Sequence, residues 1–488
     1  MMPSFLIVKL RFIIQHENMR NIDRFIGREK ELKILKNSIK NREKGVCIYG
    51  PRRVGKTTLI SVALSDLDSS VVIYYECVKG SYLYNLELLA TEASRVLGLS
   101  YIRSLRDIFD IFEAIERESR GKHIVVVIDE YPYMRESCQS GVLDSYFQRI
   151  IDNMCSNITV IISGSYITVM KEILESDSPL FGRFDRVLNI KPFSYIEASL
   201  FYPSLAFRDK IAFYAVFGGY PFSLKMIDED KSLFENIRDN LLTDGVMVRT
   251  TLENVLLTEA GRSGVPQELL SRIGNGRMRY SEIENMMSED VSGTLDRSLK
   301  RLIGMDIIEK ISPINRKDDK KKTFYEIKDN LLRFFFSYIV PNRNILIRTR
   351  PEEFYSLMIQ PSLDTFISKR FEEIVREYFF ITAGASALDI GTYWYDDRKK
   401  HKNGEFDCVL KLLDNSYKVF EVKNLSKPMS FELYKEERQK MGEIQDLKIS
   451  SFGFVSPFGF SFDTSAFPDS FLTGEDIYNN DLINYYQR

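Results

Sequence analysis

The segment GPRRVGKT, from Gly50 to Thr57, carries the residue types that bind the phosphate chain of a nucleotide. It is a full match to GxxxxGK[ST], in which the glycines let the loop curl so that backbone N–H groups point at phosphate oxygens. Lys56 is expected to place its ammonium on the outer phosphates, and Thr57 to ligate Mg²⁺. The sequence therefore predicts ATP and Mg²⁺ as cofactors. The residues expected to contact the nucleotide are Gly50, Pro51, Arg52, Arg53, Val54, Gly55, Lys56, Thr57 and Thr58.

The run HIVVVIDE, from His123 to Glu130, is continuously apolar and ends in two carboxylates. Such a run is typical of a parallel strand buried on both faces, whose carboxyl end lies where ligands bind. Asp129 is expected to orient the Mg²⁺, and Glu130 to polarise the attacking water. The simpler alternative is a strand that merely stops at a polar loop. Ser165 ends a similar run and is expected to sense the γ-phosphate, although serine after glycine is also a common turn residue.

A second group of reactive residues lies in GEFDCVLKLLDNSYKVFEVKN, from Gly404 to Asn424. Alternate side chains of a strand share a face, so Glu405 and Asp407 point together. Glu421 and Lys423 do the same on the returning strand, and the turn between brings the pairs near each other. Carboxylates beside one amine suit a Mg²⁺ or Mn²⁺ site for phosphodiester cleavage, because a structural metal would gain nothing from an ammonium.

Composition limits the elements that can position these residues. The chain has 488 residues, enough for about three domains. Its net charge of −2 excludes a protein that binds polyanions by overall charge, so DNA contact must come from local basic patches. Five cysteines without a CxxC pair predict a reducing cytoplasm rather than a disulfide framework. Three histidines argue against a multi-histidine metal site.

No targeting or membrane segment is expected. The opening FLIVKLRFII is interrupted by Lys9 and Arg11 and is too short to span a bilayer. No apolar run of about 18 residues follows, so we expect no integral membrane protein. Residues 1–20 are interpreted as a leader strand or as sequence upstream of a start at Met19.

Short helices followed by a charged hairpin occupy the middle of the chain. YSEIENMM begins with a predicted capping box, Ser281 followed by Glu284. The next helix and the basic segment NRKDDKKKTFYEI, from Asn315 to Ile327, complete a pattern that looks like a winged helix, a module that often reads a DNA groove. Winged helices also serve as interdomain spacers, and a lysine run is often only a solvated turn.

The chain resembles the archaeal ATPase family within the AAA+/STAND class in FIGREKEL from Phe25, GPRRVGKT, DEYPYM from Asp129, SGSYITVM from Ser163 and PLFGRFDR from Pro179. The resemblance implies that Arg28 borders the nucleotide and that Arg183 acts like a finger on the γ-phosphate. Either arginine could equally be a surface ion-pair partner. FGGYP, from Phe217 to Pro221, is similar to the GGxP element of the family's helical lid. A finger acting between chains would require a nucleotide-dependent homo-oligomer.

The hairpin is similar to the PD-(D/E)xK nuclease superfamily, whose D-x13-ExK spacing it shares. In the archaeal ATPase family a restriction-endonuclease-like domain sits at this C-terminal place. The resemblance implies that Asp407 and Glu421 bind the metal and that Lys423 orients or activates water. It also implies that Glu372, on an amphipathic helix, supports the site. Phe406 precedes Asp407, where the superfamily pattern has proline.

Two alternatives to a nuclease stay open at this hairpin. It could be a surface hairpin with alternating salt bridges, or a nuclease fold that only binds DNA. The basic run RKKHK, Arg398–Lys402, is expected to hold a phosphate backbone beside the carboxylates.

The sequence therefore predicts a cytoplasmic ATP-hydrolysing enzyme whose winged helix positions DNA and whose last domain cuts it with Mg²⁺ or Mn²⁺. The alternative is a regulatory STAND-type NTPase switch that binds DNA or a protein partner and carries an inactive nuclease fold. We expect an α/β multidomain protein with a doubly wound parallel sheet. The predicted domains are 1–190, a P-loop ATPase core with an N-terminal extension 1–20; 191–255, a helical lid; 256–330, a winged helix; 331–365, a helical linker; and 366–488, a restriction-endonuclease-like α/β domain.

Overall fold

The structure is a computed structural model of the chain and describes most of its residues. The described residues are 25–65, 67, 70–99, 106–119, 121–139, 141–154, 157–252, 264–274, 276–287, 292–397, 402–444, 447–479 and 481–482. The predicted extension 1–20 and the side chains of the basic run Arg398–Lys402 lie outside this part of the chain. The chain divides into two compact units, with the boundary between Pro192 and Phe193.

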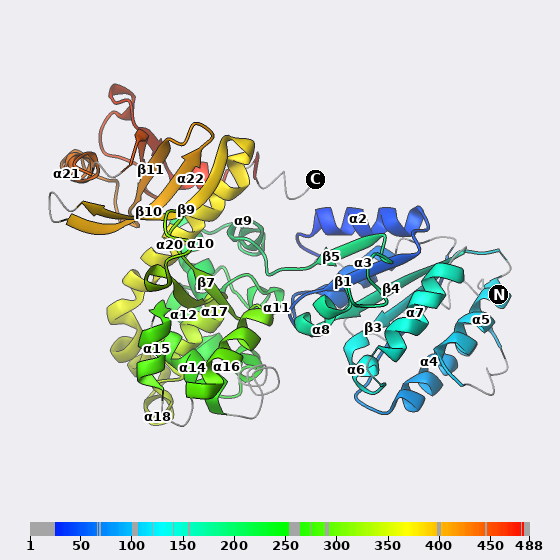
Figure 1. Cartoon of the computed structure of the whole chain (residues 1–488). Coiled ribbons are helices and arrows are strands. Elements are labelled where there is room, and N and C mark those ends of the chain that lie inside the picture. The colour runs from blue at the N-terminus through cyan, green and yellow to red at the C-terminus, as the bar shows by residue number, and fades with distance from the viewer. Residues whose placement is uncertain are drawn as a thin grey trace. The chain divides into compact units, whose positions relative to one another are not determined.

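The first unit is built on a five-stranded parallel sheet in the order β2-β3-β4-β1-β5. Its strands are β1 (Gly45–Tyr49), β2 (Val71–Glu76), β3 (Ile124–Asp129), β4 (Ile158–Gly164) and β5 (Arg186–Asn189). Its helices are α2 (Glu29–Lys40), α3 (Lys56–Ser65), α4 (Tyr82–Leu97), α5 (Ile108–Ser119), α6 (Tyr131–Glu136), α7 (Val142–Asn153) and α8 (Ile167–Glu172). Figure 1 shows α2 on one side of the sheet and α4, α5 and α7 on the other, which confirms the predicted doubly wound arrangement.

The three central strands explain the apolar runs of the sequence. Every residue of β1, β3 and β4 is buried, because helices cover both faces of the sheet. These strands are neighbours and parallel, so their carboxyl ends lie at one edge of the sheet. The P-loop, Asp129 and Ser165 follow these ends and are therefore brought together.

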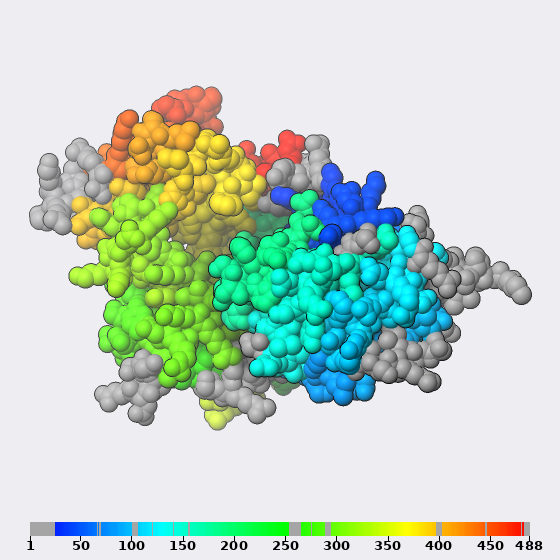
Figure 2. All heavy atoms as spheres, turned by 45° about the vertical axis from the view of Figure 1, so that its right-hand side comes forward, coloured from blue at the N-terminus to red at the C-terminus, as the bar shows by residue number. Residues whose placement is uncertain are grey.

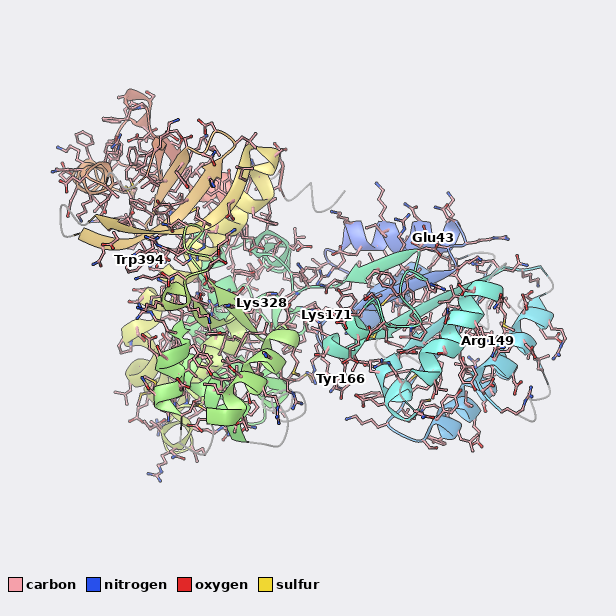
Figure 3. The ribbon with its side chains drawn as sticks, viewed as in Figure 1. Glu43, Arg149, Tyr166, Lys171, Lys328 and Trp394 are labelled. Carbon is pink, nitrogen blue, oxygen red and sulfur yellow. The ribbon has the colours of Figure 1, made fainter. Side chains whose placement is uncertain are left out.

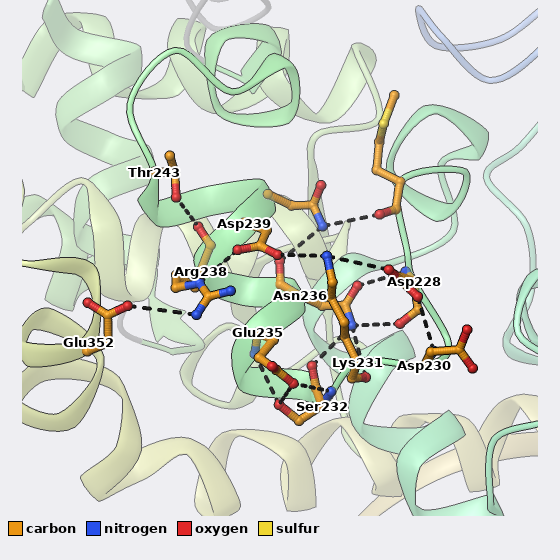
Figure 4. A network of polar contacts seen from close by, with 12 residues as sticks. Asp228, Asp230, Lys231, Ser232, Glu235, Asn236, Arg238, Asp239, Thr243 and Glu352 are labelled. Atoms are coloured by element: carbon orange, nitrogen blue, oxygen red, sulfur yellow. Dashed lines mark hydrogen bonds and ion pairs between the residues drawn. The ribbon is translucent and has the colours of Figure 1, made fainter.

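The second unit begins with a helical segment, residues 193–252. Its helices are α9 (Tyr195–Ala198), α10 (Phe207–Phe217), α11 (Pro221–Leu224) and α12 (Leu233–Ile237), followed by a π-helical turn at Arg238–Leu242. A capping box starts α12, since the Ser232 N–H donates to Glu235 at 2.8 Å and the Glu235 N–H donates to the Ser232 hydroxyl at 3.3 Å. The side-chain amide of Asn236 donates to the Asp228 carbonyl oxygen and accepts the Asp228 N–H, at 2.9 Å each (Figure 4).

The next segment, residues 264–327, is called the winged-helix-like segment. It contains α14 (Gly264–Ile273), β6 (Met278–Arg279), α15 (Tyr280–Met286), α16 (Ser292–Gly304), β7 (Ile308–Ile311) and β8 (Phe324–Ile327). The strands form an antiparallel sheet in the order β6-β8-β7. This is the element order that a winged helix would have, and its assignment as one stays a prediction.

The predicted start of α15 is wrong by two residues, because the residue before the helix is Arg279 and not Ser281. The helix begins at Tyr280, and its N-terminal contact runs from the Arg279 N–H to Glu282 at 2.7 Å. Ser281 already lies in the first turn, so it does not form the predicted box with Glu284. The reason is that β6 leads directly into the helix at Arg279 and leaves no room for a later cap.

Helices then lead into a mixed sheet at the end of the chain. They are α17 (Asn330–Phe334), α18 (Arg343–Leu346), α19 (Pro351–Phe354) and α20 (Gln360–Thr382), with π-helical turns at Phe335–Ile339 and Tyr355–Ile359. The remaining elements are β9 (Ala387–Asp397), β10 (Lys402–Leu412), β11 (Tyr417–Val422), α21 (Phe431–Gly442), β12 (Ile449–Val455), β13 (Ser470–Leu472) and α22 (Gly474–Ile477). We call residues 360–482 the terminal domain.

The sheet of the terminal domain has the order β13-β12-β11-β10-β9. Its strands β9, β10 and β11 are antiparallel, whereas β11, β12 and β13 are parallel. Figure 2 shows the yellow and orange atoms of α20 and this sheet lying against the green atoms of the winged-helix-like segment. None of the described helices has the length and continuous apolar character that a bilayer-spanning segment requires.

Candidate functional site

The P-loop connects β1 to α3, as the sequence predicts. Lys56 is buried, and its ammonium donates to the carbonyl oxygens of Gly50 at 2.9 Å and Pro51 at 3.0 Å. The ammonium therefore lies over the loop that would surround the phosphates. Gly50 needs to be glycine, because a Cβ atom there would come within 2.0 Å of the Ile190 carbonyl oxygen.

Asp129 lies at the carboxyl end of β3, next to the first turn of α3. Its Oδ2 atom accepts a hydrogen bond from the Thr57 hydroxyl at 3.0 Å, and its Oδ1 atom accepts the Glu130 N–H at 2.9 Å. Thr57 and Asp129 are therefore the two side chains that would hold Mg²⁺, since both present oxygen atoms at one point. The structure brings this predicted metal pair together.

Tyr74 completes the surroundings of Asp129 and is a residue that the sequence analysis missed. Its hydroxyl donates to the same Asp129 Oδ2 atom at 2.5 Å. Burial, followed by the charge of Asp129, raises the pKa of Tyr74 well above its usual value, so the hydroxyl keeps its proton and remains a donor. The available signal was a tyrosine in the apolar run VVIYYE, but only the pairing of β2 with β3 places it beside Asp129.

Glu130 and Ser165 are in direct contact. The Ser165 hydroxyl donates to Glu130 Oε2 at 2.8 Å, and the Ser165 N–H donates to the same atom at 3.3 Å. Arg52 of the P-loop reaches this pair, with its Nε 3.4 Å from the Ser165 hydroxyl. The Arg52 guanidinium also donates to the hydroxyl groups of Tyr133 and Tyr166, the second of which is labelled in Figure 3. The predicted base and the predicted phosphate sensor are therefore joined by one polar network.

The two arginines implied by resemblance lie in different places. Arg28 is buried and donates to the carbonyl oxygens of Val54, at 3.4 Å, and Lys191, so it borders the P-loop. Arg183 is partly exposed and forms an ion pair with Asp152 at 3.2 Å.

The position of Arg183 bears on its predicted role. Its backbone lies beside Gly45, the first residue of β1, whereas the P-loop follows the last residue of that strand. This position does not agree with a finger on the γ-phosphate of its own domain. A role in a neighbouring chain stays a prediction.

The hairpin of β10 and β11 positions the second group of predicted residues. The antiparallel ladder ends with Cys408 opposite Phe420, so Asp407 and Glu421 are the two residues just beyond its last pair. The pairing of β10 with β9 shifts register between Phe406 and Val409. Such a bulge re-aims a side chain, and Asp407 lies within it.

Two of the predicted acidic residues, Glu372 and Glu421, lie close enough to Asp407 to shift its pKa. Burial, and then the charges of Glu372 and Glu421, raise the pKa of Asp407 well above its usual range. The Lys423 ammonium lies 2.7 Å from Glu421 Oε1 and 3.6 Å from Glu437. Burial alone would lower the pKa of Lys423, but these carboxylates raise it, so the side chain is a cation.

The fit of a metal ion to this site can be judged from its ligands. Among the residues that the structure describes, no group of three or more His, Cys, Asp or Glu side chains is arranged to hold a metal ion. Mg²⁺ usually keeps several waters and binds through one or two carboxylates, a requirement that Asp407 and Glu421 meet. A cation would also relieve the repulsion between Asp407 and its acidic neighbours. In chemical type, Asp407 and Glu421 are therefore the two carboxylates that would bind Mg²⁺ here.

Arg376 is a further residue that the sequence analysis missed. It lies one turn after Glu372 on α20, and its Nη1 donates to the Asp407 carbonyl oxygen at 2.6 Å. It therefore anchors the bulged part of β10 to the helix that carries Glu372. Its spacing from Glu372 was visible in the sequence, but the bulge that frees the Asp407 carbonyl was not.

A cleft of about 660 Å³ opens beside Asp407. Residues of the winged-helix-like segment form one side, and residues of α20, β9 and β10 form the other. Charged residues of both signs line it, among them Arg277, Lys317, Glu372, Arg376, Glu405 and Asp407.

Two families match different parts of the chain, and the first match extends past the boundary at Pro192 into the second unit. Residues 25–227 match a family described as an ATPase domain predominantly from Archaea. This part of the chain is a P-loop ATPase domain. Residues 335–440 match a family of archaeal and bacterial proteins of unknown function, and this match includes α20 and the hairpin.

Individual relatives are distant. An uncharacterized protein of Methanocaldococcus jannaschii is 28% identical over 405 residues, which are 81% of this chain and 86% of the relative. A Walker-type ATPase of Pyrococcus abyssi has a TM-score of 0.46 at 19% identity, over 64% of this chain and 97% of its own. The ORC2 protein of Aeropyrum pernix, in ADPNP–ADP complexes, has a TM-score of 0.45 at 14% identity. The match covers 67% of this chain and 96% of the ORC2 chain. These structural likenesses are too distant to assign a function.

Proposed function

We propose that this protein is an ATP-dependent enzyme that cuts DNA. In this proposal the ATPase domain acts through the winged-helix-like segment on a Mg²⁺-dependent nuclease site in the terminal domain. The observation that carries the proposal is that Asp407 and Glu421 both lie just beyond the last pair of the hairpin ladder, with the Lys423 ammonium 2.7 Å from Glu421. A hairpin that served only as a surface would not need to place these charges together in half-buried positions.

Each residue of the terminal site has a separate task in this proposal. Mg²⁺ bound by Asp407 and Glu421 would polarise the phosphate. Lys423 is held as a cation by Glu421 and Glu437, so it stabilises negative charge that develops on the phosphate instead of accepting a proton. Glu372 adds a further carboxylate beside Asp407 and strengthens the attraction for a cation.

The residues of the ATPase domain divide the work of phosphoryl transfer. Lys56 and the loop N–H groups would hold the phosphates, and Thr57 and Asp129, which are hydrogen-bonded to each other, would hold a metal ion that neutralises the phosphate charge. In this structure the Ser165 hydroxyl donates to one carboxylate oxygen of Glu130. Glu130 would therefore have to release Ser165 before that oxygen could orient the attacking water. Rearrangement of this hydrogen bond is the step at which we propose that bound ATP is sensed.

A cleavage assay tests the nuclease proposal. Purified protein is incubated with linear and circular duplex DNA, ATP and either Mg²⁺ or Mn²⁺. We expect Glu421→Ala to lower cleavage by about a hundredfold, because one of two metal ligands is lost. Glu436→Ala is the matched control, since Glu436 is exposed on α21 and pairs with Lys440 at 2.8 Å. If Glu421→Ala cuts as fast as the wild type, the nuclease assignment is wrong.

A regulatory switch is the second candidate function, and the charge of the cleft favours it. Acidic side chains such as Glu309, Glu326 and Glu405 line the cleft together with the basic ones, and they oppose binding of a phosphate backbone. In this case the terminal domain would bind a partner without cutting DNA, and ATP turnover would be slow. Loss of the biological effect in Lys56→Ala but not in Lys423→Ala would favour this candidate.

A further inference from the structure

The loop between β7 and β8, residues 312–323, lies on the edge strand of the terminal sheet. In the part of the chain that the structure describes, strand β9 is the last in that sheet, and no strand pairs with its outer backbone groups. The Ile314 N–H donates to the Thr392 carbonyl at 2.8 Å. The Asn315 amide donates to the Trp394 carbonyl at 2.7 Å and accepts the Trp394 N–H at 3.1 Å. The loop therefore binds β9 much as an added strand would.

Further side-chain contacts between the loop and β9 add to these hydrogen bonds with the β9 backbone. Lys322 places its ammonium 3.1 Å from the centre of the Trp394 ring, and Lys317 forms an ion pair with Asp389. Ile314 packs so closely on Gly391 that a Cβ atom at Gly391 would lie 2.8 Å from it. Figure 3 labels Trp394 on the part of the terminal sheet nearest this segment.

A second contact lies next to the candidate metal site. Arg277, between α14 and β6, donates through Nη1 to Glu405 Oε1 at 3.1 Å and through Nη2 to the other carboxylate oxygen. Such a bidentate pair fixes geometry as well as charge. Glu405 is two residues before Asp407 on β10, so Arg277 holds the winged-helix-like segment over the strand that carries the metal ligand.

These contacts limit what can reach Asp407. The remaining cleft has a volume of about 660 Å³, which is the size of a small-molecule pocket. A DNA duplex has a major groove about 12 Å wide, and the whole double helix is larger than such a pocket can hold. Asp407 and Glu372 line this cleft, so while the loop is docked the space beside these two carboxylates is much narrower than a duplex.

We propose that docking of loop 312–323 and Arg277 on β9 and β10 is an autoinhibitory contact that closes the terminal site to DNA. This inference rests on the proposed nuclease function. Opening requires the loop to leave β9 and Arg277 to leave Glu405. Arg277 is 41% exposed, so water and salt weaken its ion pair, and the closed form is held by several modest contacts that a ligand can displace.

The chain carries its own reporter of this contact, because Trp394 is its only tryptophan. The test compares the wild type with Arg277→Ala/Asn315→Ala, which removes both the ion pair and the amide contact. Arg272→Ala/Asp318→Ala is the matched control, since Arg272 pairs with Glu268 on its own helix and Asp318 is exposed on the same loop. Acrylamide quenching of tryptophan fluorescence, thermal melting and DNA cleavage are measured on all three proteins.

We expect the first variant to melt cooperatively, to show stronger quenching of Trp394 and to cut DNA about tenfold faster than the wild type. The control variant should match the wild type in all three measurements. Lower ionic strength should increase the protection of Trp394 in the wild type, because the ion pairs strengthen.

The remaining outcomes separate this inference from the proposed function. Unchanged quenching in the Arg277→Ala/Asn315→Ala variant would overturn the closing contact. Stronger quenching without faster cutting, in a protein whose wild type does cut, would overturn its inhibitory role. Stronger quenching with no cutting by any of the proteins would support the contact and refute the nuclease function.

Discussion

The carboxylate of Asp129 accepts two hydroxyl groups on one oxygen, from Thr57 and Tyr74. Its other oxygen accepts the N–H of Glu130, so the group is held in one orientation toward the P-loop. The P-loop motif pointed to Thr57 and the apolar run that ends in two carboxylates pointed to Asp129, and the structure brings these two side chains together. Tyr74 could not be predicted in this way, because its role depends on which strand pairs with β3.

Substitution of Tyr74 by phenylalanine tests this orientation. We expect Tyr74→Phe to lower ATP hydrolysis by about tenfold, because outer partners of a metal ligand hold it in place. Tyr75→Phe is the control: it is the same change one residue later, where the hydroxyl donates to Asn85 at 2.7 Å instead of to Asp129. Initial rates of phosphate release give the comparison, and equal rates in the two variants would contradict a role for Tyr74.

At the scale of elements, the helical segment that follows the ATPase sheet is held by a close backbone approach at Gly219. The Phe193 N–H donates to the Gly219 carbonyl at 2.8 Å. A Cβ atom at Gly219 would lie 2.1 Å from the Phe193 carbonyl oxygen, which no side chain can accommodate without backbone movement. The resemblance singled out FGGYP, and the structure supplies the physical reason for its second glycine.

Alanine at position 219 should therefore disturb the start of the second unit. We expect Gly219→Ala to lower the free energy of unfolding by more than about 2 kcal/mol, since the strain falls on backbone atoms. Gly442→Ala is the control, because the nearest atom there is the flexible end of Arg438 at 3.2 Å. Urea unfolding measures both, and a similar midpoint for the two variants would disprove the packing argument.

Strands were predicted well where a short, continuous apolar run marks them in the sequence. The runs at β1, β2, β3 and β4 are apolar because both faces of the sheet are covered, and length alone then favours strands. The start of α15 and the bulge at Asp407 were not predicted, because each depends on a partner strand. Local sequence does not say that β6 ends at Arg279 or that β10 shifts register against β9.

At the scale of the whole molecule, a buried ion-pair network joins parts of the second unit that the sequence suggested as separate domains. Arg333 of α17 lies 3.1 Å from Glu326 of β8 and 2.9 Å from Glu373 of α20. Arg370 of α20 contacts the same two carboxylates, at 2.9 Å and 3.2 Å. The predicted division into lid, winged helix, linker and terminal domain stays a prediction. The ion pairs could not be predicted, because contacts between distant segments leave no mark on the composition of either segment.

Buried carboxylates make the stability of this unit depend on pH. Burial is the main cause that raises the pKa values of Glu309 and Glu377 from 4.5 to about 7. Between pH 4.5 and about 7 the folded state therefore binds more protons than the unfolded state. The free energy of unfolding falls as the pH rises through this range. We expect a loss on the order of 1–3 kcal/mol per group between pH 5 and about 8.

The variant Glu377→Gln should flatten this dependence, because its side chain has no charge to bury. Urea unfolding is measured at low and neutral pH for the wild type, Glu377→Gln and the exposed control Glu353→Gln. The first variant should be more stable than the wild type only at the higher pH. An unchanged slope in Glu377→Gln would show that its carboxylate is not the source.

The position of loop 312–323 also affects how copies of this protein behave toward each other. Strand β9 has 11 residues, and an uncovered edge of that length offers a template for pairing with another chain. The loop satisfies the backbone of Thr392 and Trp394 and places lysines along the margin of the sheet. Any condition that lifts the loop therefore also removes a safeguard against aggregation, and preparations of an opened variant should lose solubility at high protein concentration before they lose their fold.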